Sequence, residues 1–342
     1  MTSLYIEPDK LEEFALFEKE LPHWNKVIKS GIELKINISE DKLNQRLIDD
    51  FDPIGIAYQS SATMQLPSAD EDYINELKAD LNKTIEKPSA IYILDITENS
   101  AIDKQLELGV ALYASTNVPE KAFAKTYFKE VSKNEIINDG WKKLIDFEKP
   151  LSNSLIITDN FFLTNEDGGI NRGLANLVPF LDGYLPEGLK TDYHVTIVSQ
   201  NIKLGRHKTQ EWWIKEYGKI VAAVKLLRDY TICIEFVLAK SEIHKRRIIS
   251  NYSISKADKG FDLFHSTNLK KIKEENDFEY LEIFSNLDNS GTKHFESIDK
   301  LLSQLGKHCS EISTYVAAQN NKLDRCLYGC NPDKSVKNRL LN

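Results

Sequence analysis

Residues 154–163 read SLIITDNFFL. An apolar run of this kind, followed by a turn-forming stretch at 166–169, predicts a buried strand. Two further apolar runs, at 193–199 and 231–238, follow at intervals that each leave room for one helix. Strands that alternate with helices are typical of crossover units, so the sequence predicts an α/β fold with a parallel or mixed sheet.

The two intervening helices carry their own signals. Residues 171–181 have helical character and are followed by Gly183 and Pro186, which commonly end helices. Thr209 is the predicted N-cap of the second helix, because Glu211 then falls in the first turn, where a negative charge is favourable. Apolar residues at helical spacing give that helix one buried face, formed by Trp213, Tyr217, Ile220, Val221, Val224 and Leu227.

The N-terminal half is predicted to be an α/β domain of its own. Its first 30 residues favour a helix, and its best strand is the apolar run at 90–96. The remaining predicted elements are strands at 34–38, 54–58 and 110–113 and helices at 70–85 and 101–106.

A chain of 342 residues exceeds the usual size of one hydrophobic core, so we expect a domain boundary. The sequence places it between 140 and 153, near Lys149 and Pro150. The expected domains are an N-terminal α/β domain over 1–150, a mixed-sheet domain with helices on both faces over 151–295, and a C-terminal helix with a polar tail over 296–342.

The composition, 41% hydrophobic and 28% charged, is that of a globular protein. No apolar run approaches the roughly 18 to 20 residues of a spanning helix, and no targeting segment is evident. The four cysteines, at 233, 309, 326 and 330, are too few for a disulfide framework, so we expect a cytoplasmic protein. The net charge of −8 argues against attraction of a polyanion by the whole surface, and a local basic patch would be needed.

Such a patch is present in the sequence. Six basic residues lie within twenty positions, and Arg206, His207 and Lys208 precede the second helix. A solvated charged loop is the alternative interpretation. If the patch binds a polyanion, nucleic acid is favoured over lipid, because apolar membrane anchors are not evident. The six residues are Lys240, Lys245, Arg246, Arg247, Lys256 and Lys259.

The run IHKRRIISNY at 243–252, followed by GFDLF at 260–264, resembles the phospholipase D superfamily, whose pattern is His-x-Lys, four residues, then Asp. Here the pattern is His244, Arg246 and Asn251. The closer resemblance is to the C-terminal domain of MIT-domain proteins and its bacterial relatives, which also have a strand with an aspartate and aromatic residues upstream, here Asp159, Phe161 and Phe162. It covers roughly residues 152–290.

The resemblance implies that His244 is the nucleophile, that Arg246 grips a phosphate group, and that Asn251 replaces the acidic member. Lys240, Lys245, Arg247, Lys256 and Lys259 would contribute to phosphate binding. The sequence contains no second His-x-Lys copy, so catalysis would require a homodimer. No cofactor and no metal is expected, and an active enzyme would be a metal-independent phosphodiesterase or nuclease.

The expected function is therefore the binding, and as a dimer the cleavage, of nucleic-acid phosphodiesters, with bacterial stress or antiviral defence suggested by the relatives. Two alternatives stay open. One is a scaffold without catalysis, whose protein partner binds the N-terminal domain, and the other is a lipid-headgroup binder.

Two clusters of potential metal ligands are disfavoured by the sequence. His308, Cys309, Cys326 and Cys330 lack the spacing of common zinc sites. The acidic residues Asp95, Asp103 and Glu107 follow an apolar strand, where such groups are commonly caps or surface charges.

Overall fold

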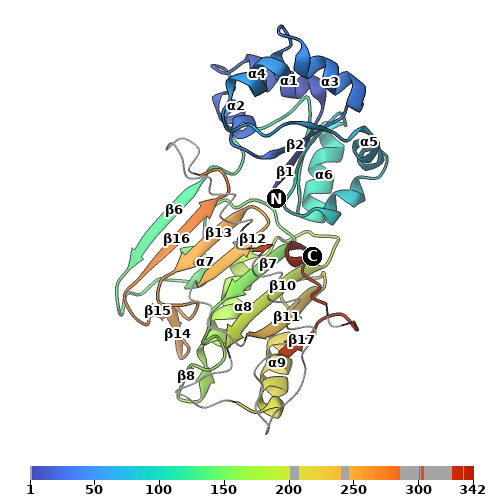
Figure 1. The fold of residues 1–342 in the computed structure, drawn as a ribbon. Helices are drawn as coiled ribbons and strands as arrows, with labels where there is room; N and C mark the ends of the chain where they lie inside the picture. Colours follow the sequence, from blue (N-terminus) through green and yellow to red (C-terminus); the bar gives the residue numbers. More distant parts are fainter. Residues whose placement is uncertain are drawn as a thin grey trace. The chain divides into compact units, whose positions relative to one another are not determined.

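A computed structural model describes residues 2–200, 208–239, 246–285, 300, 302–303, 326–333 and 335–342. The chain divides into two compact units (Figure 1). Unit 1 comprises Met1–Lys125 and Glu282–Lys300, and unit 2 comprises Thr126–Leu281 and Leu301–Asn342. Both units combine strands and helices, so the predicted α/β class is confirmed.

The division lies between 125 and 126, and not near Lys149 and Pro150 as the sequence suggested. The reason is that the stretch before Pro150 contributes a strand and a helix to unit 2. Strand β6 (Thr126–Val131) pairs antiparallel with β16 (Asn276–Glu282), and helix α7 (Trp141–Leu144) supplies Trp141 to the core.

Unit 1 contains a parallel five-stranded sheet in the order β3-β2-β1-β4-β5. The strands are β1 (Ser3–Ile6), β2 (Glu33–Ile36), β3 (Ser68–Ala69), β4 (Ile91–Leu94) and β5 (Ala111–Ala114). The helices are α1 (Pro8–Leu16), α2 (Pro22–Lys29), α3 (Glu40–Ile48), α4 (Pro53–Ser60), α5 (Glu71–Ala79), the 3-10 helix η1 (Leu81–Glu86) and α6 (Glu98–Leu108).

Two predictions for unit 1 were wrong. Residues 1–30 do not form one helix, since β1 comes first and Pro8 and Pro22 each begin a separate helix, a position that suits proline. The expected strand at 54–58 is helix α4, because the Asp52 side chain caps it by accepting hydrogen bonds from the backbone amides of Ile54 and Gly55.

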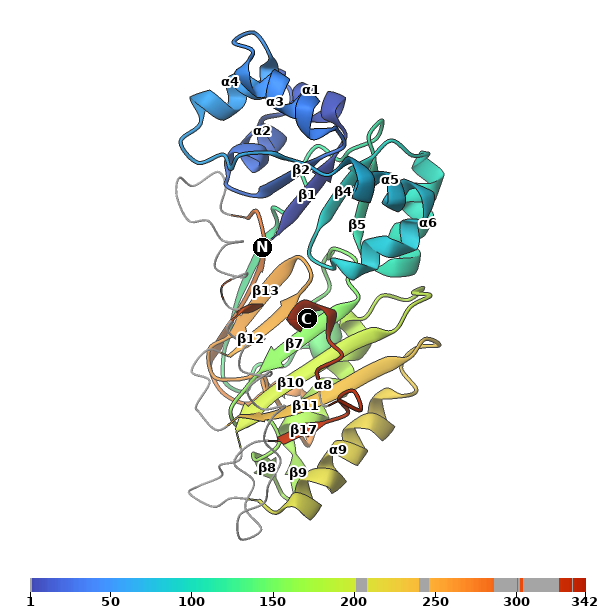
Figure 2. The same ribbon diagram turned by 45° about the vertical axis from the view of Figure 1, so that its right-hand side comes forward.

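Unit 2 is built on an eight-stranded mixed sheet in the order β17-β11-β10-β7-β12-β13-β16-β6. At its centre β7 (Ser154–Thr158), β10 (Tyr193–Gln200) and β11 (Ile232–Ala239) are parallel and lie side by side (Figure 2). The other strands of the sheet are β12 (Arg247–Ser250), β13 (Ser253–Ala257) and β17 (Cys326–Tyr328), together with β6 and β16. Two small hairpins pair β8 (Glu166–Asp167) with β9 (Ile170–Asn171), and β14 (Phe264–His265) with β15 (Asn268–Ile272).

The three described helices of unit 2, α7, α8 (Arg172–Tyr184) and α9 (Gln210–Val224), cover one face of this sheet. Their buried side chains form one cluster with alternate residues of β7, β10 and β11, which in a strand point to the same face. The opposite face meets the terminal segment 335–342, including the 3-10 helix η2 (Arg339–Leu341), through Asn338. Helices on both faces were expected, but the C-terminal helix predicted at the start of 296–342 falls almost entirely outside the described residues.

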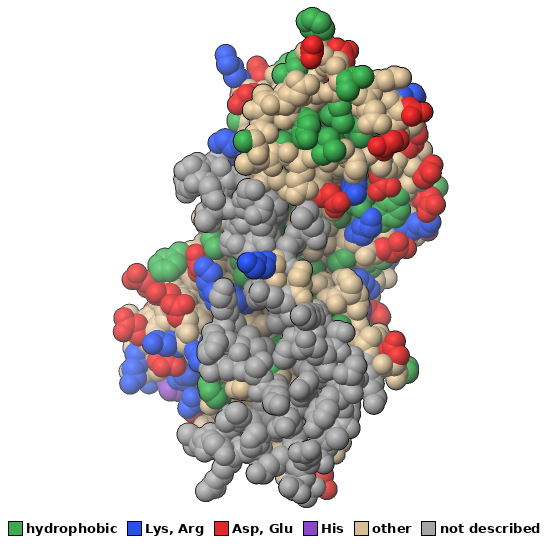
Figure 3. Space-filling view, in the orientation of Figure 1, with side chains coloured by type: hydrophobic (Ala, Val, Ile, Leu, Met, Phe, Trp, Pro, Cys, Tyr) green, Lys and Arg blue, Asp and Glu red, His purple; other side chains and the backbone are tan. Residues whose placement is uncertain are grey.

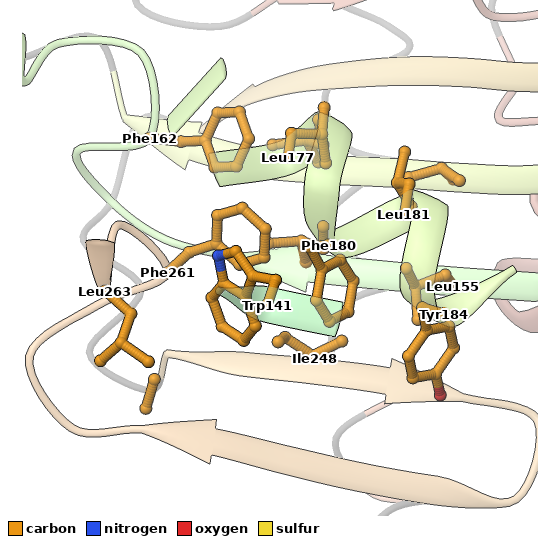
Figure 4. Packing of buried hydrophobic residues seen from close by; sticks show 14 of the residues in the cluster. Trp141, Leu155, Phe162, Leu177, Phe180, Leu181, Tyr184, Ile248, Phe261 and Leu263 are labelled. Carbon is orange, nitrogen blue, oxygen red and sulfur yellow. The ribbon is translucent and has the colours of Figure 1, made fainter. Parts of the chain in front are cut away.

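Local signals position the helices as expected. The Thr209 hydroxyl accepts a hydrogen bond from the Trp212 backbone amide, so Thr209 is the N-cap of α9. Trp141 is fully buried, stacks on Phe261 at 5.6 Å between ring centroids and meets Phe180 edge-on at 5.1 Å (Figure 4). Its indole N–H donates to Asn176 Oδ1 at 2.8 Å. The core thereby ties α7 and α8 to the loop that carries residues 260–264.

Candidate functional site

The carboxyl ends of the three central strands of unit 2 meet at one edge of the sheet, where open α/β sheets bind their ligands. Asp159 follows the last residue of β7, and Gln200 is the last residue of β10. Strand β12 runs antiparallel to β7 with Arg247 opposite Thr158. This pairing brings Arg246 to the same edge as Asp159.

Asp159 is a buried acid, with 4% of its surface exposed. Its carboxylate accepts hydrogen bonds from the backbone amides of Phe161 at 2.9 Å and Phe261 at 2.8 Å. Burial raises the pKa of Asp159 and the neighbouring Asp262 acts in the same direction, although the two amide bonds and the charge of Arg246 oppose the shift. Perturbed acids of this kind are concentrated at functional sites.

Gly260 allows the charged side chains to approach one another. Its φ of +125° favours glycine, and a Cβ at this position would lie 2.9 Å from Asp159 Oδ2 and 3.1 Å from Asp262 Oδ1. The same Cβ would lie 3.8 Å from Cδ of Arg246. A side chain at position 260 would therefore separate the two carboxylates and the guanidinium group.

Two more basic side chains lie next to Asp262. Lys273 Nζ lies 2.8 Å from Asp262 Oδ2, and Arg172 Nη1 lies 3.6 Å from the same oxygen. Arg172 also pairs with Asp167 at 2.5 Å, at the β8–β9 hairpin. Acidic and basic groups therefore alternate in the site, and ion pairs hold Lys273 and Arg172 in place.

The described residues of the predicted basic patch are largely engaged with acidic or carbonyl groups. Arg246 Nη1 donates to the carbonyl of Asp258 at 3.0 Å. Arg247 is half-buried, and desolvation lowers the pKa of its guanidinium group. Lys256 forms an ion pair with Glu279, while Lys259 is exposed. Figure 3 likewise shows basic and acidic side chains intermixed over the part of unit 2 that carries β6, β15 and β16.

Asn251 lies at the other end of β12 from Arg246. It is buried, and its Oδ1 accepts hydrogen bonds from the backbone amides of Asn153 at 3.2 Å and Ser154 at 3.1 Å. Five residues of extended chain span roughly 16 Å, so Asn251 orders the start of β7 and not the edge where Arg246 lies. The structure does not bring these two predicted site residues together.

Three predicted residues, Lys240, His244 and Lys245, lie outside the described residues, as do Arg206 and His207 of the preceding loop. The residues that sequence reasoning left out of the site are Asp159 and Asp262. Both residues belong to stretches on which the resemblance is based. The sequence signal that would have identified Asp159 is its position directly after an apolar strand.

In unit 1 the acidic residues Asp95, Asp103 and Glu107 do not form a metal-ligand group within the described part of the chain. Asp95 donates its backbone amide to Glu7 Oε1 at 3.0 Å, and Glu107 pairs with Lys104 at 2.7 Å. Glu7 in turn accepts a hydrogen bond from Asn37. The contacts of Glu7 with Asp95 and Asn37 join the segments that follow β4 and β2 to the carboxyl end of β1.

No protein-family model matches the chain, and no curated protein matches it. Among solved structures, the chain is similar to TrmBL2, an archaeal chromatin protein whose structure shows a novel mode of DNA binding, with 11% sequence identity. The similarity covers 74% of this chain and 70% of that one at a TM-score of 0.22, which does not establish a common fold. Within the described residues, every helix is too short or too polar to cross a membrane.

Proposed function

We propose that unit 2 is a phospholipase D-like module that binds phosphate groups of nucleic acid at the carboxyl ends of β7, β10 and β11. The observation that carries the proposal is the placement of Arg246 beside Gly260 and the buried Asp159. A guanidinium group has five N–H donors, and among the described residues Arg246 uses one of its nitrogens, to Asp258. The remaining donors suit a bidentate grip on phosphate.

Nucleic acid is favoured over a lipid headgroup by the start of α9, which follows β10 in the chain. There Trp212 is half-buried and Lys208 Nζ lies 4.6 Å from the centre of its ring. An aromatic ring beside a cation suits a stacked base and its phosphate. The intermixed charges of the surface also favour a local contact over attraction by a broad basic face.

Cleavage is the second part of the proposal and depends on His244, which the resemblance assigns as nucleophile. Because the sequence holds one such motif, two chains would each contribute a histidine. Arg246 would hold the phosphate group, and Asp159 would fix the turn beside it.

To test binding, we would measure the affinity of the wild-type chain, Arg246→Ala and Arg246→Lys for labelled single- and double-stranded DNA and RNA. We expect Arg246→Ala to weaken binding by about 1.5 to 3 kcal/mol, the scale of a hydrogen bond to a charged group, and Arg246→Lys to weaken it less. Wild-type binding should fall with salt by roughly one log-log unit per phosphate contact.

Lys143→Ala is the matched control, because Lys143 is an exposed cation of α7 in unit 2 that pairs with Asp146. It should bind like the wild type. Nucleic-acid binding that depends neither on salt concentration nor on Arg246 would contradict the proposal. Tighter binding to anionic vesicles than to nucleic acid would support the lipid alternative instead.

A further inference from the structure

Three potential metal ligands meet at the amino ends of β10 and β11, the edge of the sheet opposite Arg246. Strands β10 and β11 pair in parallel with His194 directly opposite Cys233, and Asp192 immediately precedes β10. One donor atom of each residue lies within 4.8 Å of the other two. The Cys233 thiol donates to Asp192 Oδ2 at 3.8 Å.

His194 points independently to a ligand. It is 9% exposed, and its Nδ1 is buried with no hydrogen-bond partner among the described residues. Its other ring nitrogen bonds to the backbone of Lys337, whose amide already donates to Glu235, so the ring N–H donates to the Lys337 carbonyl. In the neutral ring the lone pair is then on Nδ1. A buried acceptor without a hydrogen-bond partner lowers the stability of the fold.

We propose that Asp192, His194 and Cys233 bind one Zn²⁺ through a carboxylate oxygen, Nδ1 and a thiolate, with water at the fourth position. A sulfur, nitrogen and oxygen set suits zinc, and the carboxylate and thiolate balance its charge. The hydrogen bond from the ring of His194 to a backbone carbonyl is the outer-sphere contact that orients ligating histidines.

The donors need only a small movement to reach the metal. Tetrahedral zinc with the usual bond lengths places its ligand atoms about 3.4 to 3.7 Å apart. The Asp192 oxygen and Cys233 sulfur are 3.8 Å apart, and these two atoms and a ring nitrogen of His194 all lie within 4.8 Å of one another. Asp192 is exposed and Cys233 half-buried, so the ion can enter from solvent.

Bound zinc would fasten the terminal segment 335–342 to the sheet. Arg339 donates to the carbonyl of Asp192 at 2.8 Å, and Lys337 and Asn338 donate their backbone amides to the buried Glu235 of β11. Ligation of Asp192 and His194 would order the residues that hold this segment. The proposed role is therefore structural, and zinc should raise the stability of the full chain by mass action.

To test the proposal, we would titrate metal-free full-length chain with Co²⁺ and then with Zn²⁺. The wild type would be compared with Cys233→Ser and with the control Cys330→Ser, which alters another free cysteine of unit 2. We expect one Co²⁺ per chain with a thiolate-to-cobalt charge-transfer band that Zn²⁺ displaces. Cys233→Ser should lose the band and bind zinc at least about tenfold more weakly, while Cys330→Ser keeps both.

A second measurement does not depend on the folding of a variant. Zinc should protect Cys233 of the wild-type chain from alkylation, mapped by mass spectrometry, and raise the thermal midpoint. Absence of cobalt binding, a band that persists in Cys233→Ser, or alkylation of Cys233 at an unchanged rate in zinc would each overturn the proposal.

Discussion

The carboxylate of Asp159 accepts a 2.8 Å hydrogen bond from the backbone amide of Phe261. The bond fastens the end of β7 to the turn through Gly260, and so fixes the surroundings of Arg246. The geometry of the proposed phosphate site therefore depends on an acid whose charged form is disfavoured by burial.

The raised pKa of Asp159 predicts an unusual pH dependence of stability. Its folded-state pKa lies above the unfolded value of about 3.9, so its contribution is fully present below that value and is lost as the pH rises through the folded pKa. Relative to Asp159→Asn, the wild-type chain should become more stable on acidification from neutral pH. Urea unfolding of both proteins at several pH values measures the difference.

Asp333 is a control for which the expected change of stability with pH has the opposite sign. Hydrogen bonds from Ser335 lower the pKa of this exposed group. The wild type should therefore lose stability relative to Asp333→Asn as the pH falls through the folded pKa. A difference between wild type and Asp159→Asn that stays constant with pH would show that Asp159 does not titrate as an acid with a raised pKa.

Gly260→Ala should damage both the fold of the turn and phosphate binding. The substitution combines a φ of +125° with a Cβ 2.9 Å from Asp159 Oδ2, and strain of this kind costs about 1 to 3 kcal/mol. Gly188→Ala is the matched control, because its Cβ would meet nothing within 4 Å. Urea unfolding and nucleic-acid binding would be measured for both, and equal stability of the two variants would contradict the proposed role of Gly260.

The position of the domain boundary can be tested with fragments. Residues 126–342 should fold cooperatively, whereas 152–342, which begins at the boundary expected from sequence, lacks β6 and the fully buried Trp141. Truncation of a buried tryptophan costs about 3 to 5 kcal/mol, so Trp141→Ala in the longer fragment should be severely destabilised. Circular dichroism and limited proteolysis measure both effects, and an equally cooperative 152–342 would restore the earlier boundary.

Local signals allowed much of this architecture to be predicted. The strands β10 and β11 and the cap at Thr209 each depend on neighbouring residues, and the structure has them within one position of the prediction. The strand predicted over 154–163 is β7, which ends at Thr158, because the chain turns at Asp159. Helix α4 was missed because its apolar residues also fit a strand, and the capping by Asp52 decided the outcome.

The sites depend on strand register, which the sequence does not reveal. The pairing of β12 with β7 places Arg246 beside Asp159 and carries Asn251 away from it. The pairing of β10 with β11 likewise joins His194 to Cys233, which are 39 positions apart in the chain. Motif spacing along one segment could identify Arg246, but not partners from other strands.

His244 separates binding from cleavage. It precedes Arg246 by two positions and lies outside the described residues. His244→Ala should leave nucleic-acid affinity nearly unchanged, because Arg246 supplies the fixed charge, and should reduce cleavage by orders of magnitude, because the chain has no second copy of the motif. Gel assays of labelled DNA and RNA measure cleavage, with His265→Ala as the histidine control.

Chelator distinguishes this mechanism from a metal-dependent one. The proposed zinc site is at the opposite edge of the sheet, so cleavage by the wild type should persist in chelator and in Cys233→Ser. Activity that survives in His244→Ala, or that vanishes in chelator while the chain stays folded, would contradict the phospholipase D mechanism and direct attention to acidic residues such as Asp95. A wild-type chain that binds nucleic acid in an Arg246-dependent way but never cleaves it would retain the phosphate site and support the non-catalytic alternative.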